Sequence, residues 1–182
     1  MPSDPGGEIP LRRLLDVRSA PAKGLRGAFT ATSEERAALS AWFDLADLAS
    51  LAVNYEIKPL DRGRARLIGR LRAEATQTCV ATGEPVPASI DESFDVEFWP
   101  ADQLGRAARE LDIRAEDADP PEPMIDGRID AGAFAAELLG VSLDPYPRKP
   151  GAEFAPVETP EDAAGANPFA VLASVRGGDK SR

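Results

Sequence analysis

The side chains that most often carry out catalysis or bind metal ions are scarce in this sequence. Its 182 residues include no histidine and a single cysteine, Cys79. The missing histidine removes the commonest general acid–base group and the commonest metal ligand together. A reactive thiol needs a basic neighbour, and Thr78-Cys79-Val80 carries no charge. We therefore expect Cys79 to be structural, and we expect no metal and no cofactor.

Carboxylates are the remaining candidates for chemistry. Sites for magnesium or calcium built from carboxylates alone stay open, but Asp126-Gly127-Arg128-Ile129-Asp130 lacks the ligand spacing of a calcium loop. The sequence contains no glycine-rich phosphate loop, nucleophile elbow or catalytic dyad spacing. We expect a protein that is not an enzyme. Catalysis by carboxylates alone is the least favoured alternative.

A stripe of arginines is the most prominent charged pattern. Such a ladder on one strand face can bind phosphates. The acidic side chains of a following strand (Asp91, Asp95 and Glu97) offer another interpretation, in which cross-strand ion pairs neutralise the stripe. We favour pairing, with an excess of positive charge still possible at the end that holds Arg62 to Arg66. The stripe consists of Arg62, Arg64, Arg66, Arg70 and Arg72.

The overall charge points to the kind of partner. Lys and Arg number 21 and Asp and Glu number 31, which gives a formal net charge of −10. Such a chain is repelled by phosphate backbones, so direct RNA contact is disfavoured and a basic protein is the easier partner. No run of about 18 apolar residues predicts a membrane helix. With one cysteine and no signal peptide, we expect a cytoplasmic protein. The oligomeric state does not follow from the sequence.

The elements that must position these groups are clearest between residues 51 and 99. Apolar and polar residues alternate over 51–58, 65–75 and 88–98. Turns at Asp61-Arg62-Gly63 and Thr82-Gly83-Glu84-Pro85 separate the three segments. This pattern predicts an antiparallel meander with one buried face.

Matching the faces of the second and third strands predicts their register. Leu71 then lies opposite Phe94, and Arg70 lies opposite Asp95. Residues 25–31 are expected to form a further strand. The predicted fold class is α+β, an antiparallel sheet over about 51–99 with a few flanking short helices.

Capping residues indicate the flanking helices. A capping box from Thr32 to Glu35 predicts a helix over about 33–43, followed by a short helical piece over 44–50. A strand–turn unit is expected over 124–129, with a helical turn near 103–111. Asp130 then caps a helix to about Leu139, and Gly140 is its natural C′ residue.

The predicted domain organisation has three parts. Residues 1–8 form a flexible N-terminus, 9–150 form the α+β domain, and 151–182 form an extended tail. A short helix over 167–175 is expected in the tail, because Asn167 can cap it and Pro168 suits its first position. Its apolar residues can bind a partner groove or pack back on the domain, and both alternatives stay open.

Several segments in one order resemble a known family. They are Gln77-Thr78-Cys79-Val80-Ala81-Thr82-Gly83-Glu84-Pro85-Val86, the strand from Phe94 to Phe98, the helix start at Ile129-Asp130, the segment Pro145-Tyr146-Pro147-Arg148-Lys149-Pro150, and Asn167-Pro168-Phe169. Together they resemble, over about residues 10–175, the YceD-like large ribosomal RNA subunit accumulation proteins of alphaproteobacterial type. Many members carry Cys-x-x-Cys where this chain has Cys79 and Thr82, and further cysteines where it has Gly151 to Phe154. A metal-binding role is therefore not carried over.

The resemblance implies a role in accumulation of large-subunit ribosomal RNA. We expect a non-enzymatic factor that binds a large-subunit precursor or a basic ribosomal protein. The alternative is a general protein-interaction or chaperone-like module without a ribosomal role. The expected partner contacts are Arg64, Arg66, Tyr146, Arg148 and Lys149, because Arg and Tyr are enriched where binding energy concentrates.

Overall fold

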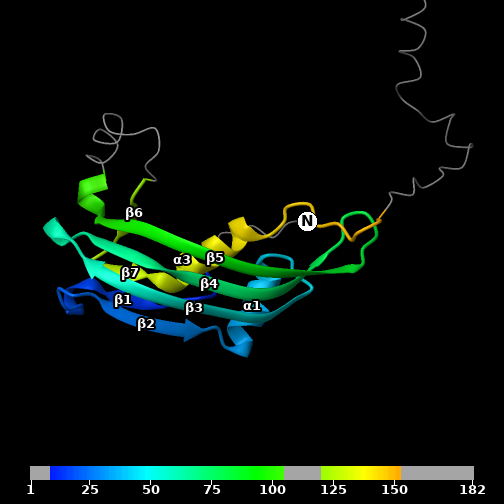
Figure 1. The fold of residues 1–182 in the computed structure, drawn as a ribbon, viewed down its shortest axis with the longest axis horizontal. Coiled ribbons are helices and arrows are strands. Elements are labelled where there is room, and N and C mark those ends of the chain that lie inside the picture. Colours follow the sequence, from blue (N-terminus) through cyan, green and yellow to red (C-terminus); the bar gives the residue numbers. More distant parts are fainter. Residues whose placement is uncertain (1–8, 105–119, 153–182) are drawn as a thin grey trace, which may run out of the picture. The chain divides into compact units, whose positions relative to one another are not determined.

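The computed structural model describes residues 9–104 and 120–152, which build a sheet of five strands (Figure 1). Each strand lies beside its neighbour in sequence. The first four are antiparallel, and the last runs parallel to the strand before it. The strands are β2 (Leu25–Thr30), β3 (Asp47–Pro59), β4 (Ala65–Thr78), β5 (Pro85–Pro100) and β6 (Glu122–Met124).

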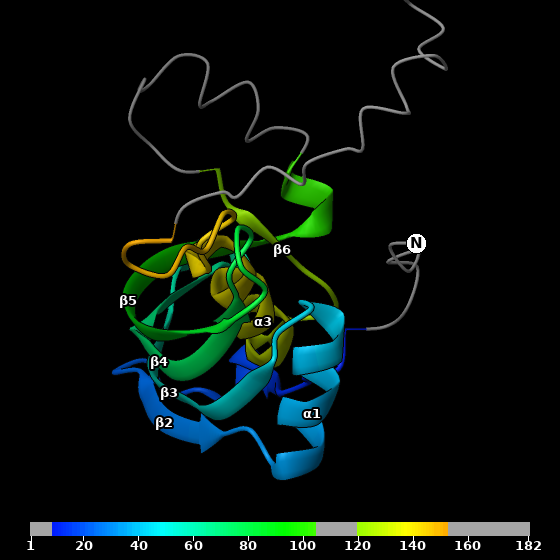
Figure 2. The same ribbon diagram turned by 90° about the vertical axis from the view of Figure 1, so that its right-hand side faces the viewer.

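The remaining elements complete an α+β fold, as predicted. Residues 14–16 and 128–130 pair as a separate two-stranded sheet. Two helices lie on the same side of the large sheet (Figure 2). None of the described helices combines the length and apolar character needed to cross a membrane. These elements are β1 (Leu14–Asp16), η1 (Val17–Ser19), α1 (Ser33–Trp42), η2 (Asp61–Gly63), β7 (Arg128–Asp130), α3 (Ala131–Ser142) and a helical segment at 101–104. The expectations for 1–8, 105–111 and 153–182, including the 167–175 helix, lie outside the described residues.

The core lies between the helices and one face of the sheet. Inward-facing residues of β3 and β4, such as Val53 and Leu71, are buried with Leu39 of α1 and Leu139 of α3. Alternation along the strands places the charged residues on the opposite face. Among the described side chains, no buried nitrogen or oxygen atom lacks a hydrogen-bond partner.

The predicted register between β4 and β5 is wrong by two residues. Phe94 lies opposite Gly69 rather than Leu71, and Asp91 lies opposite Arg72. A two-residue slip keeps every side chain on its predicted face, so face matching could not detect it. The observed register places the large Phe94 ring opposite a residue without a side chain. A Cβ on Gly69 would lie 2.5 Å from Cζ of Phe94 and 2.2 Å from the Asn54 carbonyl oxygen. The bare glycine makes room for the aromatic ring.

Residues 44–50 were predicted to be helical, and this is wrong. α1 ends at Trp42, and Asp44 has φ 53°, a left-handed conformation that stops the helix. β3 begins at Asp47 and pairs with β4, with a register shift between Leu48 and Ser50. Pairing with the neighbouring strand therefore overrides the local helical preference.

The predicted end of the second helix is also wrong. α3 continues to Ser142, so Gly140 is an internal residue rather than its C′ residue. A Cβ on Gly140 would lie 2.7 Å from Cε1 of Phe43. Close packing of α3 against the end of α1, and not helix termination, explains this glycine.

Arg13, which lies just before β1, contacts the N-terminal ends of both α1 and α3. Its guanidinium donates to both carboxylate oxygens of Glu35, at 2.6 and 2.8 Å, and lies 5.3 Å from the centroid of the Phe29 ring. Its backbone N–H donates to Asp130, the N-cap of α3, and its carbonyl accepts from the Ala131 N–H. Glu35 also accepts from the Thr32 N–H, which completes the predicted capping box.

We predict that Gly132→Ala destabilises the domain although alanine is the better helix former by about 1 kcal/mol. A Cβ there would lie 2.7 Å from backbone atoms of Arg12 and Arg13, which cannot move without breaking the Arg13 contacts. The expected net loss is about 1–2 kcal/mol, measured by urea unfolding. Val141→Ala on the exposed side of α3 is the control, and an equal loss there would contradict the prediction.

We also predict that Glu35 makes the stability of the folded state depend on pH in the acid range. The ion pair with Arg13 lowers the pKa of Glu35 to about 2. The carboxylate therefore stabilises the folded state above its unfolded pKa, and this contribution disappears as the pH falls toward about 2. Glu35→Gln should be less stable at neutral pH, and the difference should vanish in acid. Glu34→Gln on the same turn is the matched control for the loss of one carboxylate, and an equal loss of stability at neutral pH there would contradict the prediction.

Candidate partner-binding surfaces

Three arginines of the stripe lie on the sheet face away from the helices and are paired with aspartates there. Arg66 donates to both oxygens of Asp95, at 2.5 and 2.7 Å. Arg70 forms the same paired contact with Asp91, to which Arg72 also donates at 3.3 Å. Hydrogen bonds from these arginines lower the pKa of both aspartates. The favoured interpretation is confirmed for Arg66, Arg70 and Arg72, although Arg70 pairs with Asp91 and not with its predicted partner.

Arg64 is held at the end of the stripe by an aromatic contact. Its guanidinium carbon lies 3.3 Å from the centroid of the Trp99 ring, and its Nε donates to Gln103 at 3.0 Å. The Trp99 indole N–H donates to Glu97 at 3.0 Å. One face of the guanidinium is thereby covered by Trp99. Arg64 therefore makes contacts within the domain.

The other predicted contacts lie on a segment that docks against the turn after β4. The Val80 N–H donates to the Pro147 carbonyl at 2.9 Å, and Gln77 donates to the Asp144 carbonyl at 2.8 Å. Lys149 forms an ion pair with Glu84 at 3.0 Å. Pro147 is buried, whereas Tyr146 is 74% exposed and Arg148 is also exposed. The backbone is fixed and the two side chains point outward.

The structure divides the five predicted contact residues into two groups. Arg64 and Arg66 lie at the start of β4, and Tyr146, Arg148 and Lys149 lie beside its end. A strand of 14 residues spans roughly 45 Å, so the groups cannot form one small site.

Cys79 lies in the turn that receives this segment. Its side chain is buried at 2% exposure, and its sulfur accepts the Lys149 N–H at 3.4 Å. This bond, followed by donation from the Thr82 hydroxyl and the backbone N–H groups of Ala81 and Thr82, lowers the thiol pKa to about 7. The sequence showed no basic neighbour, but backbone N–H groups supply the stabilisation instead. Among the described residues, no three His, Cys, Asp or Glu side chains are grouped to hold a metal ion.

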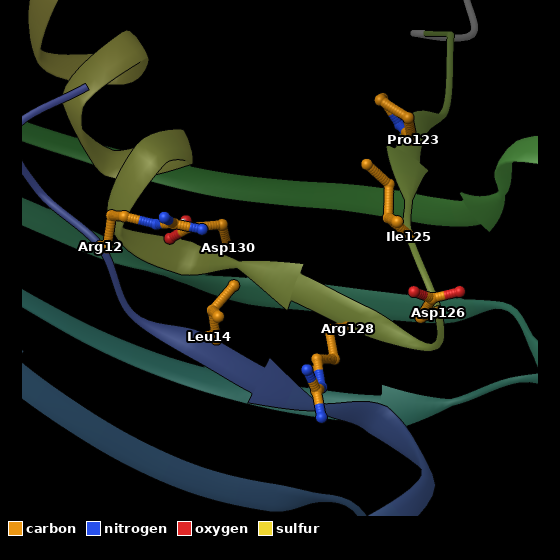
Figure 3. A pocket seen from close by; sticks show the side chains of 7 residues that line it. All are labelled: Arg12, Leu14, Pro123, Ile125, Asp126, Arg128 and Asp130. Carbon is orange, nitrogen blue, oxygen red and sulfur yellow. The ribbon is translucent and has the colours of Figure 1, made fainter. Parts of the chain in front are cut away.

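A shallow cavity that sequence reasoning missed lies beside the two-stranded sheet (Figure 3). Its volume is about 340 Å³, and two exposed apolar side chains, Leu14 (53%) and Ile125 (70%), line it. Arg12 and Asp130 form an ion pair at its border at 3.3 Å, and Arg128 lies nearby. The basic and acidic lining residues balance, so charge gives no indication of a partner.

These features describe a small α+β protein with one large sheet, helices on a single face, and exposed side chains at its ends. The chain belongs to the family Large ribosomal RNA subunit accumulation protein YceD, whose model matches residues 67–175, more than half of its length. The match begins within β4, later than the expected residue 10. The family's name links it to accumulation of large-subunit ribosomal RNA. No curated protein and no solved structure matches the chain.

The Cys79 environment gives a prediction about pH. A thiolate stabilised in the folded state contributes stability above its unfolded pKa, and this is lost as the pH falls through about 7. The stability of the wild type relative to Cys79→Ala should therefore increase between pH 7 and 9. Thr82→Val removes one donor and should raise the thiol pKa, measured by ultraviolet absorbance of the thiolate. An unchanged pKa in Thr82→Val would contradict the assignment of that donor.

Proposed function

We propose that this chain is a non-enzymatic factor that supports accumulation of the large-subunit ribosomal RNA in the cytoplasm. It acts by binding a large-subunit precursor particle or a basic protein of that particle. Family membership supports the ribosomal setting. The lack of histidine and the absence of a catalytic motif support a role in binding.

One observation carries the binding part of the proposal, namely the exposed Tyr146 and Arg148 on a fixed backbone. A tyrosine side chain with 74% exposure makes little contribution to the core. The segment is already anchored to Val80, Gln77 and Glu84, so binding through it orders little additional backbone. Tyr and Arg on such a support are typical of residues that dominate an interface.

The electrostatics favour contact with protein over contact with phosphate. Arg66, Arg70 and Arg72 are paired with aspartates, and Arg64 stacks on Trp99. Three of the stripe's five arginines therefore already have carboxylate partners, while the chain as a whole carries −10. A basic protein of the particle suits these charges better.

We predict that Tyr146→Ala combined with Arg148→Ala reduces comigration with large-subunit precursors in sucrose gradients roughly tenfold. The tagged full chain would be expressed in cells that lack the native copy, and large-subunit RNA would be measured relative to small-subunit RNA. Both readouts should fall together, because removing two anchors weakens binding without altering the fold.

Lys23→Ala is the charge-matched control, since Lys23 is exposed and remote from this segment. It should behave as wild type. The proposal is refuted if the wild-type protein never comigrates with large-subunit precursors and its loss leaves ribosomal RNA levels unchanged.

A further inference from the structure

β5 has an edge that is open over most of its length. β6 pairs with it only from Phe98 to Pro100, near its C-terminal end (Figure 1). Among the described residues, Pro85–Glu97 has a neighbouring strand, β4, on one side only. Pro120 and Pro121 immediately precede β6 and lack N–H groups, so the chain cannot extend β6 along β5 with a full ladder. Unpaired backbone groups at such an edge can pair with another strand.

An apolar groove lies between this edge and α3. Its volume is about 390 Å³, and its apolar lining comes from Phe94, Val96, Pro120, Phe134 and Leu138. The Phe134 ring packs edge-on against Phe94, with ring centroids 5.2 Å apart, so the two rings form a packed floor of the groove. A side chain from an added strand can therefore enter a preformed apolar site.

Carboxylates lie at the groove and beside it. Glu122 lines it, Glu137 projects from α3, and Glu92 is exposed on the β5 face that looks toward α3. Within the described ranges, none of the three forms an ion pair with Lys or Arg. Burial, and then the charge of Glu122, raise the pKa of Glu137. A cationic group placed here would relieve this repulsion between like charges.

Net charge argues against the parts of this chain, and against a second copy of it, as occupants of the groove. Segment 105–119 contains three arginines and five acidic residues, and 153–182 contains three basic and five acidic residues. Residues 1–8 contain two acidic residues and no basic one. A second copy of the chain carries −10. All four have the wrong sign for a groove bordered by carboxylates.

We propose that an extended, lysine- or arginine-rich segment of a partner protein adds as a strand to β5 along Ser93–Glu97. Alternate side chains of that segment enter the apolar groove, while its basic side chains meet Glu122 and Glu137. This mode of recognition gives affinity through backbone hydrogen bonds and specificity through pockets for alternate residues. The inference rests on the proposed function and names the chemistry of its protein partner.

The test uses the full chain and a fluorescent peptide of alternating lysine and valine. Glu122→Lys combined with Glu137→Lys should weaken binding roughly tenfold, measured by anisotropy at physiological salt. Glu34→Lys combined with Asp47→Lys gives the same change in net charge away from the groove and should alter binding less than about threefold. If the reversal variant does not fold, Glu122→Gln combined with Glu137→Gln should weaken binding in the same direction.

Hydrogen exchange provides a second measurement. The peptide should slow exchange of the β5 amides between Asp91 and Glu97, because a new strand protects them. A peptide of the same composition with lysines and valines in separate blocks should bind at least about tenfold more weakly. Equal binding of the block peptide, equal loss in the control variant, or no added protection in β5 would each overturn the proposal.

Two further outcomes identify a different occupant and also overturn it. If replacing 105–119 with a glycine–serine linker of equal length tightens peptide binding more than about tenfold, that segment occupies the groove. If the charge-reversal variant changes the oligomeric state by light scattering, a second copy occupies it. The peptide assay contains no ribosomal particle, so a negative result there does not refute the proposed function. Comigration in sucrose gradients tests that function separately.

Discussion

The bidentate contact between Arg13 and Glu35 connects the segment before β1 to the first turn of α1. Arg13 comes from the lead-in to β1, Glu35 lies in the first turn of α1, and Asp130 caps α3. The same arginine therefore fixes both helix N-termini relative to the edge of the sheet. Its backbone lies so close to α3 that Gly132 has no room for a Cβ. The placement of both helices on one face depends on this point.

That one-sided arrangement decides where binding features can occur. The helices cover one face of the sheet, and the other face carries cross-strand ion pairs that satisfy its arginines. Exposed ion pairs of this kind contribute little to stability, typically below about 1 kcal/mol each. Their consequence here is electrostatic, because they offset part of the positive charge that would otherwise attract phosphates. The available binding features are then the ends of the sheet and the edge of β5.

Much of the fold could be predicted from local patterns. Period-two alternation indicated β3, β4 and β5, and the capping box indicated α1, because both signals depend only on neighbouring residues. The register of β4 with β5 could not be predicted from faces alone, since the space above Gly69 that accommodates Phe94 is a property of two strands together. The same reason applies to Gly140, whose role depends on Phe43 some hundred residues earlier. The open edge of β5 depends on β6 beginning only opposite Phe98, which the sequence of β5 itself does not encode.

The Cys79 turn shows why individual site residues are harder to predict than elements. Its chemistry looked inert because no charged neighbour stood beside it in sequence. In the structure the Lys149 N–H reaches the sulfur across 70 positions, and the Lys149 ammonium reaches Glu84 in the same turn. One residue thus lowers the thiol pKa through its backbone and fixes the turn through its side chain. These contacts also hold the segment that presents Tyr146 and Arg148. The environment of the thiol and the proposed binding surface therefore depend on the same contacts between this segment and the turn after β4.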